Sequence, residues 1–166
     1  MKQAQTRTVR GTKAAVEKLA EMLEAKGQKV VVNDLARCDM AEAVEDAFRY
    51  SKLVLATTTY NGDIFPFMKE YIHSLTERNY QNRTVAFIEN GSWAPLAAKI
   101  MKDMLAKSPN LTFIEPVVHI RSALNDTNKE EISALCQALS VDYLARDEKK
   151  ANKNDMKALF SIGYGL

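Results

Sequence analysis

Two short polar segments, each with a single aromatic residue, are the parts of this sequence best suited to binding chemistry. We call residues 57–62 the tyrosine segment and residues 90–93 the tryptophan segment. They consist of Thr57, Thr58, Thr59, Tyr60, Asn61 and Gly62, and of Asn90, Gly91, Ser92 and Trp93. Stacking on the two rings supplies affinity for a planar heteroaromatic molecule, and backbone amides with Thr and Asn side chains supply hydrogen bonds to its edge. The two segments therefore predict a slot for a planar ring.

No residues in the sequence are spaced for covalent or metal chemistry. The only histidines are His73 and His119, and the two cysteines, Cys38 and Cys136, stand alone. Neither a ligand cluster for metal ions nor a disulfide framework is indicated, and no nucleophile with an adjacent base is recognisable. We therefore expect binding residues, with no catalytic residue and no metal site.

Both segments follow predicted strands in a chain that alternates strand and helix. Short apolar runs predict strands, and amphipathic runs predict helices. The strands are expected at 29–33, 52–56, 83–89 and 112–120, and the helices at 12–26, 41–50, 66–75, 97–105 and 129–145. This alternation predicts a parallel sheet with helices on both faces. In such sheets, ligands bind beyond the carboxyl ends of the strands.

Particular residues predict where these elements begin and end. Thr12 and Asp39 are expected N-caps. Pro66 suits a first helical turn, and Gly27 suits the position just after a helix. The tyrosine segment is rich in hydroxyl and turn residues, so we expect it to leave the sheet as a loop. Residues 1–10 are polar and are expected to form a tail or a poor edge strand.

The composition is that of one ordinary domain. The 166 residues are 46% hydrophobic and 27% charged, which is enough apolar material for a buried core, and the net charge is +2. The basic residues are spread along the chain, so no nucleic-acid partner is expected. No apolar stretch approaches the roughly 18 residues of a membrane span, and the N-terminus lacks the apolar core of a signal peptide. We therefore expect no membrane partner and a cytoplasmic location.

The order of elements and the two segments resemble the flavodoxin-like domain of flavodiiron (A-type) flavoproteins, over roughly residues 11–145. In that family the first loop reads Ser-Pro-Thr-Tyr/Ile-Asn-Asn/Gly before Phe/Leu-Pro, and here the tyrosine segment leads to Phe65 and Pro66. The second loop ends Gly-Trp-Ser/Gly-Gly, whereas here Trp93 lacks the flanking glycines. The resemblance implies a three-layer α/β/α sandwich with sheet order 2-1-3-4-5. It also implies FMN as cofactor, with its flavin ring held by both segments.

The start of the chain departs from this family. A flavodoxin begins with an apolar central strand and a hydroxyl-rich loop, which binds the FMN phosphate at the N-terminus of the first helix. Here residues 1–10 replace that strand, so the first strand is expected to be degenerate or missing. Only Gly11 and Thr12 of the loop are retained, and the resemblance assigns Thr12 to the phosphate. Thr6 and Thr8 offer further hydroxyls, and Arg7 and Arg10 offer positive charge.

The resemblance also implies a domain organisation and partners. Residues 1–145 are expected to be the flavodoxin-like domain, with an atypical segment at 1–10, and residues 146–155 a charged linker. Residues 156–166 resemble the opening of flavin-reductase-like domains fused to flavodiiron proteins, and are expected to be the truncated start of one. The implied partners are a diiron, metallo-β-lactamase-like domain as electron acceptor and a flavin reductase or rubredoxin-type donor. A homodimer is left open.

Three functions agree with these residues. The resemblance implies an FMN-binding electron-transfer domain that passes electrons to the diiron centre, as part of an oxygen or nitric oxide reductase system. The alternative is a flavodoxin-fold remnant without flavin that serves as a docking or structural module. The form of residues 1–12 distinguishes these two. An FMN-dependent quinone or azo reductase is a weaker third hypothesis, because no residues in the sequence indicate a substrate pocket over the flavin.

Overall fold

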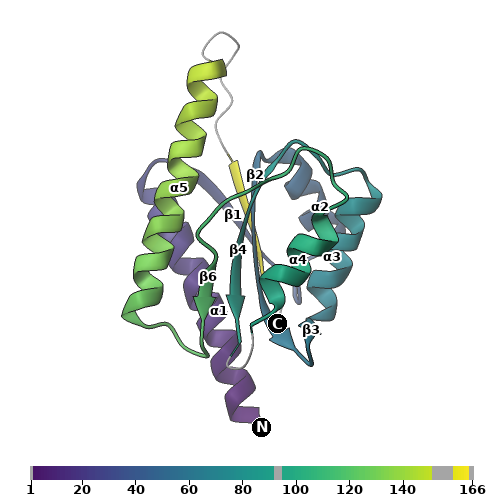
Figure 1. Ribbon diagram of the computed structural model, residues 1–166, viewed down its shortest axis with the longest axis vertical. Helices are drawn as coiled ribbons and strands as arrows, with labels where there is room; N and C mark the ends of the chain where they lie inside the picture. The colour runs from purple at the N-terminus through teal and green to yellow at the C-terminus, as the bar shows by residue number, and fades with distance from the viewer. Residues whose placement is uncertain (1, 92–94, 151–158, 165–166) are drawn as a thin grey trace.

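A computed structural model describes residues 2–91, 95–150 and 159–164 of the chain (Figure 1). The elements in chain order are α1 (Lys2–Ala25), β1 (Lys29–Asp34), α2 (Met40–Arg49), β2 (Lys52–Tyr60), β3 (Asp63–Ile64), α3 (Pro66–Glu77), β4 (Thr84–Asn90), α4 (Ala97–Leu105), β5 (Thr112–Phe113), β6 (Val118–Ile120), α5 (Asp126–Lys150) and β7 (Leu159–Tyr164). Helices α1 and α5 cover one face of the central sheet, and α2, α3 and α4 cover the other (Figure 1). The expected three-layer sandwich is confirmed.

The sheet has the expected arrangement of parallel strands. Its main path runs β1-β7-β2-β4-β5, which by position is the order 2-1-3-4-5. Strand β5 pairs with the start of β4 and β6 with its end, so the strand expected at 112–120 is divided into two short edge strands. Pro116 lies between them. Proline has no N–H to donate to a ladder, which explains why the interruption falls there.

Strands β2 and β4 are buried on both faces. Because successive side chains point to opposite sides of a sheet, Val54 and Ala56 belong to the core under α1 and α5. Leu53 and Leu55 belong to the core under α2, α3 and α4. The apolar run of β2 therefore has no polar alternation, because each of its faces needs apolar side chains.

A strand from the C-terminal part of the chain forms the centre of the sheet. Strand β7 pairs in parallel with β1 along Leu159–Tyr164, and with β2 from Phe160 onwards. We expected the first strand to be degenerate or missing, and among the described residues no strand precedes α1. We also expected residues 156–166 to begin a separate domain, but residues 159–164 of this segment form β7, which takes the position of the first strand. The reason lies in the backbone, since a gap between β1 and β2 would leave N–H and C=O groups unpaired in the middle of the sheet.

Helix α1 begins at Lys2, so residues 2–10 are helical and the expectation of a tail or edge strand was wrong. This stretch contains no proline, and its Lys, Gln, Ala and Arg residues favour helix. Thr12 lies within the helix and is not its N-cap. Gly11 is buried where a Cβ atom would come within 2.4 Å of the backbone oxygen of Ser122. Glycine at this position therefore lets α1 approach the connection between β6 and α5.

Other element boundaries agree with the sequence or extend beyond the expectation. The Asp39 carboxylate caps α2 by accepting from the Ala41 N–H (2.8 Å), Pro66 opens α3, and Gly27 follows α1 with a φ of 80°. Helix α5 continues to Lys150, so the first part of the expected charged linker is helical, while residues 151–155 lie outside the described ranges. None of the described helices is both long and apolar enough to cross a bilayer.

The position of β7 predicts a large effect of one proline. Ile162 pairs with Val32 of β1 and Val54 of β2, so Ile162→Pro removes a ladder donor in the middle of the sheet. We expect a loss of about 3 kcal/mol or more in the free energy of unfolding, measured by urea denaturation followed by circular dichroism. Ile162→Val keeps the backbone donor and should cost less than about 1.5 kcal/mol. Equal stability of the two variants would mean that β7 does not belong to the sheet.

The contact at Gly11 predicts that a better helix former destabilises α1. Gly11→Ala gains about 1 kcal/mol in helix propensity, but its methyl group overlaps the Ser122 carbonyl. We expect a net loss of roughly 1–2 kcal/mol in the free energy of unfolding. Lys18→Ala, at an exposed position of the same helix, should stay within about 0.5 kcal/mol of the parent. A more stable Gly11→Ala variant would contradict the close approach of α1 to Ser122.

Candidate functional site

The tyrosine and tryptophan segments follow neighbouring strands at the carboxyl edge of the sheet, but the tyrosine segment is mostly strand. Its first two residues pair with the last two residues of β4, and its next two pair with the short antiparallel strand β3. The expectation that the chain leaves the sheet at Thr57 was therefore wrong. The backbone of β2 pairs with β4 as far as Thr58. Beyond Thr58, it pairs with β3 in the hairpin.

The turn itself consists of Asn61 and Gly62. Their φ values are 47° and 71°, and the flanking residues Tyr60 and Asp63 pair across the hairpin. Two successive positive φ values are typical of the type I′ turn, which matches the twist of a two-residue hairpin and favours Asn-Gly. The Asn-Gly pair is the sequence signal that could have predicted this hairpin.

Tyr60 presents an aromatic ring at this edge. Its ring stacks on that of Phe65, with a centroid distance of 5.0 Å and an interplanar angle of 23°. Tyr60 remains 42% exposed. Phe65 directly precedes Pro66, the first residue of α3, so the hairpin and the helix start together fix the plane of the tyrosine ring. The exposed part of Tyr60 leaves surface for contact with a further planar group.

The ends of β2 and β4 also hold the start of α4. The Thr59 hydroxyl oxygen accepts from the backbone N–H groups of Leu96 and Ala97, both at 3.2 Å. The Glu89 carboxylate accepts from the Ala98 N–H at 2.7 Å. Leu96, the residue in the N-cap position, gives no side-chain cap of its own. These two strand residues therefore satisfy N–H groups that a helix start leaves without an internal partner.

The same edge holds α1 through buried polar side chains. The Asn90 amide group donates to the Thr12 hydroxyl (3.2 Å), and its carbonyl oxygen accepts from the Ser122 N–H (3.0 Å). The Thr12 and Thr58 hydroxyls lie 3.5 Å apart. Thr12 is 2% exposed and Asn90 is fully buried. These three side chains join α1 to the ends of β2 and β4.

The structure thus divides the predicted site residues into three groups. Tyr60, Asn61 and Gly62 are exposed at the hairpin. Six others are buried or hydrogen-bonded inside the fold: Thr12, Thr57, Thr58, Thr59, Asn90 and Gly91, the last through its N–H to the Ile120 oxygen (3.0 Å). Ser92 and Trp93 lie outside the described residues. The Thr57 hydroxyl is buried without a hydrogen-bond partner among the described residues.

Two carboxylates at this edge have polar partners. Lys69 hydrogen-bonds to Asp63 at 2.7 Å and, with the Ile64 N–H, lowers the pKa of that carboxyl. Glu89 is buried and contacts the imidazole of His119, which is half exposed. The sequence indicates the place of Glu89, because it lies near the end of β4 directly before the tryptophan segment. No sequence pattern indicates the contact with His119.

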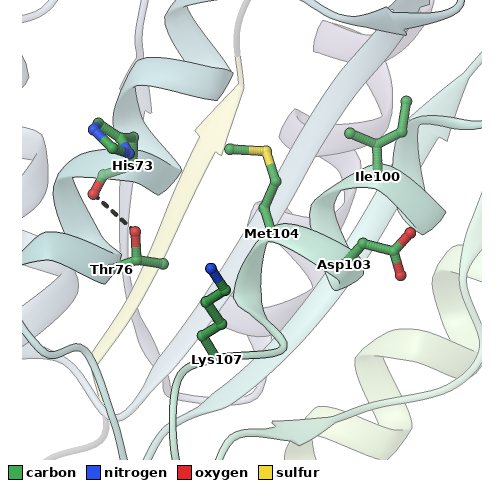
Figure 2. Close-up of a pocket in the computed structure, with 6 residues that line it drawn as sticks. All are labelled: His73, Thr76, Ile100, Asp103, Met104 and Lys107. Atoms are coloured by element: carbon green, nitrogen blue, oxygen red, sulfur yellow. Dashed lines mark hydrogen bonds between the residues drawn. The ribbon is translucent and has the colours of Figure 1, made fainter.

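A cavity of about 450 Å³ lies between α3 and α4, away from the start of α4 (Figure 2). Figure 2 shows His73 and Thr76 of α3 across from Ile100, Asp103 and Met104 of α4, with Lys107 at one end. Thr76 donates to the backbone oxygen of His73 at 2.9 Å. None of the predicted site residues lines this cavity, so it is separate from the carboxyl edge of the sheet.

The two hydrogen bonds to Thr59 predict a stability effect at α4. Thr59→Ala removes the oxygen that accepts from Leu96 and Ala97, and we expect a loss of about 1–2 kcal/mol in the free energy of unfolding. Amide hydrogen exchange at Leu96 and Ala97 should become faster. Thr59→Ser keeps the oxygen and serves as the matched control. Unchanged exchange in Thr59→Ala would rule out this capping role.

No protein-family model matches the sequence, and no curated protein matches it. Solved structures do match. Rubredoxin oxygen:oxidoreductase from Desulfovibrio gigas superposes with a TM-score of 0.77 at 14% identity, over 82% of this chain and 34% of that one. The flavodiiron protein from Giardia intestinalis superposes with a TM-score of 0.69 at 13% identity, over 84% of this chain and 34% of that one.

Smaller proteins match over nearly their whole length. Oxidised flavodoxin 1 from Bacillus cereus gives a TM-score of 0.68 at 14% identity, over 79% of this chain and 90% of the flavodoxin. The chain therefore spans about a third of the two larger proteins and most of a flavodoxin. At these identities the likeness establishes the architecture alone. The chain has a flavodoxin-like fold.

Proposed function

We propose that this chain is a flavin-binding electron-transfer domain, with the ring of the flavin at the carboxyl edge of β2 and β4. One observation carries the proposal. A flavodoxin-like fold presents a partly exposed tyrosine, stacked on Phe65, at the end of the strand next to the sheet centre. Open α/β sheets bind ligands in this position, and FMN is the flavin that the sequence resemblance implies.

The residues that would hold the flavin lie mainly on the hairpin. Tyr60 would stack on the ring, and backbone groups of the Asn61-Gly62 turn would hydrogen-bond its edge. Ser92 and Trp93 of the tryptophan segment are proposed as the second wall of the slot. When bound, the flavin supplies the redox chemistry, whereas the protein supplies binding, orientation and electrostatics. No side chain of this chain has to act as nucleophile or base.

The partners are proposed on the same basis. The donor would be a flavin reductase or a rubredoxin-type protein, and the acceptor a diiron domain, because a flavodiiron protein and a rubredoxin oxygen:oxidoreductase are among the similar structures. A cytoplasmic location is part of the same proposal. The proposed function is thus one step in an oxygen- or nitric-oxide-reducing system rather than a complete reaction.

A specific observation favours the alternative of a remnant that binds no flavin. The Thr58, Thr59 and Asn90 side chains, which the sequence assigns to the flavin, are hydrogen-bonded to α1 and α4. A fold that uses these groups internally can stand as a docking or structural module without a cofactor. The two proposals differ in whether the exposed ring of Tyr60 binds anything.

A titration of FMN with the purified chain tests the choice. We expect the chain to quench flavin fluorescence. Tyr60→Ala should raise the dissociation constant for FMN about tenfold, because ring stacking is lost. Tyr60→Phe keeps the ring and should change the affinity less than threefold. Circular dichroism establishes that each variant is folded. Absence of quenching by the folded parent chain would favour the remnant, and equal affinities of the Ala and Phe variants would remove Tyr60 from the site.

A further inference from the structure

The geometry of α1 determines what kind of flavin this site can select. Anions bind readily at the start of a helix, because the first N–H groups there have no partner within the helix. In this chain α1 runs without interruption from Lys2 to Ala25. Gly11 and Thr12 lie more than two turns inside it, where each N–H is within reach of the carbonyl four residues earlier. The helix therefore offers no open N–H groups at the edge of the sheet.

Space beside Gly11 is also filled. The position of a Cβ atom on Gly11 is 2.4 Å from the Ser122 backbone oxygen and 3.1 Å from the Asn90 side-chain nitrogen. A phosphate group is much larger than a methyl group, so it cannot enter here unless α1 moves away from Ser122. The oxygen closest to this point is a carbonyl oxygen, which repels an anion.

The hydroxyl groups next to this position already have polar partners. Thr12 is 2% exposed, accepts from Asn90 at 3.2 Å and lies 3.5 Å from the Thr58 hydroxyl. A phosphate that used the Thr12 oxygen would have to break the contacts that join α1 to β2 and β4. The residue that the sequence resemblance assigns to the phosphate thus serves to position α1.

None of the described residues supplies a buried cation at this edge to compensate a dianion. Among the side chains that the structure describes, the one buried cation is Lys52 at the start of β2, and its amine donates to the Leu139 oxygen. The buried charge at the carboxyl edge is the Glu89 carboxylate, at the end of β4. Arg10 is exposed on α1, where solvent and salt weaken its attraction for an anion.

We infer that this site selects the flavin ring and does not recognise the phosphate of FMN, so that riboflavin and FMN bind with similar affinity. The inference rests on the proposed function, because it presumes that the ring binds at Tyr60. It departs from the sequence resemblance, which implies a phosphate loop at Thr12. The ligand class is therefore a flavin ring system with or without a phosphorylated side chain.

Parallel fluorescence-quenching titrations of the full chain with riboflavin and with FMN test this inference. We expect the two dissociation constants to agree within about threefold, and ten millimolar inorganic phosphate to leave both unchanged. Two charge-assisted hydrogen bonds to the phosphate would instead favour FMN by roughly a hundredfold. A preference for FMN of tenfold or more would overturn the inference while supporting the proposed function. Binding of neither flavin by the folded chain would overturn both.

Charge variants on α1 provide the control. Arg10→Gln removes the exposed cation nearest Gly11 in sequence, and Lys13→Gln removes another exposed cation from the same helix. We expect both variants to keep the parent's ratio of riboflavin to FMN affinity within about twofold. A selective loss of FMN affinity in Arg10→Gln alone would identify a phosphate contact at Arg10 and would overturn the inference.

Discussion

The pairing of β7 with both β1 and β2 is the interaction on which the rest of this structure depends. Central strands exchange backbone hydrogen bonds on two sides, and water cannot replace those bonds once helices cover both faces. Without β7, the two neighbours would present unpaired edges beneath α1 and α2. The flavodoxin-like order of the sheet, and with it the common edge at which β2 and β4 end, follows from this one shared strand.

The polar residues at that edge serve two purposes that compete with each other. A flavin site needs free hydroxyl and amide groups, whereas the helices need partners for their own N–H groups and for close packing. Here the second need dominates, since Thr59 and Glu89 hold α4 while Thr58 and Asn90 hold α1. What remains exposed is the ring of Tyr60 and the Asn61-Gly62 turn of the hairpin. In the proposed site, ring stacking and backbone hydrogen bonds would therefore supply the affinity.

Local signals in the sequence predicted much of this fold. The apolar runs of β2 and β4, the cap at Asp39, the glycine after α1 and the proline at α3 all appear in the structure as expected. The errors concern residues whose partners are distant in sequence. The polar pattern of residues 2–10 predicts no regular structure, yet these residues are part of helix α1. The sequence of β7 predicts the start of another domain, because the pattern does not show that β7 pairs with β1 and β2. The roles of Thr12 and Gly11 depend on Asn90 and Ser122, which periodicity does not reveal.

The place of β7 in the chain has a consequence for biosynthesis. A strand that lies in the middle of the sheet is the last described element to leave the ribosome. Until β7 is made, β1 and β2 each lack the strand that pairs with them in the finished sheet. The nascent chain therefore exposes two strand edges that can pair with other strands. The joining of β1 to the rest of the sheet must therefore wait until β7 is translated, whereas β2 and β4 can pair without it. Contacts between such distant parts of a chain make folding slow.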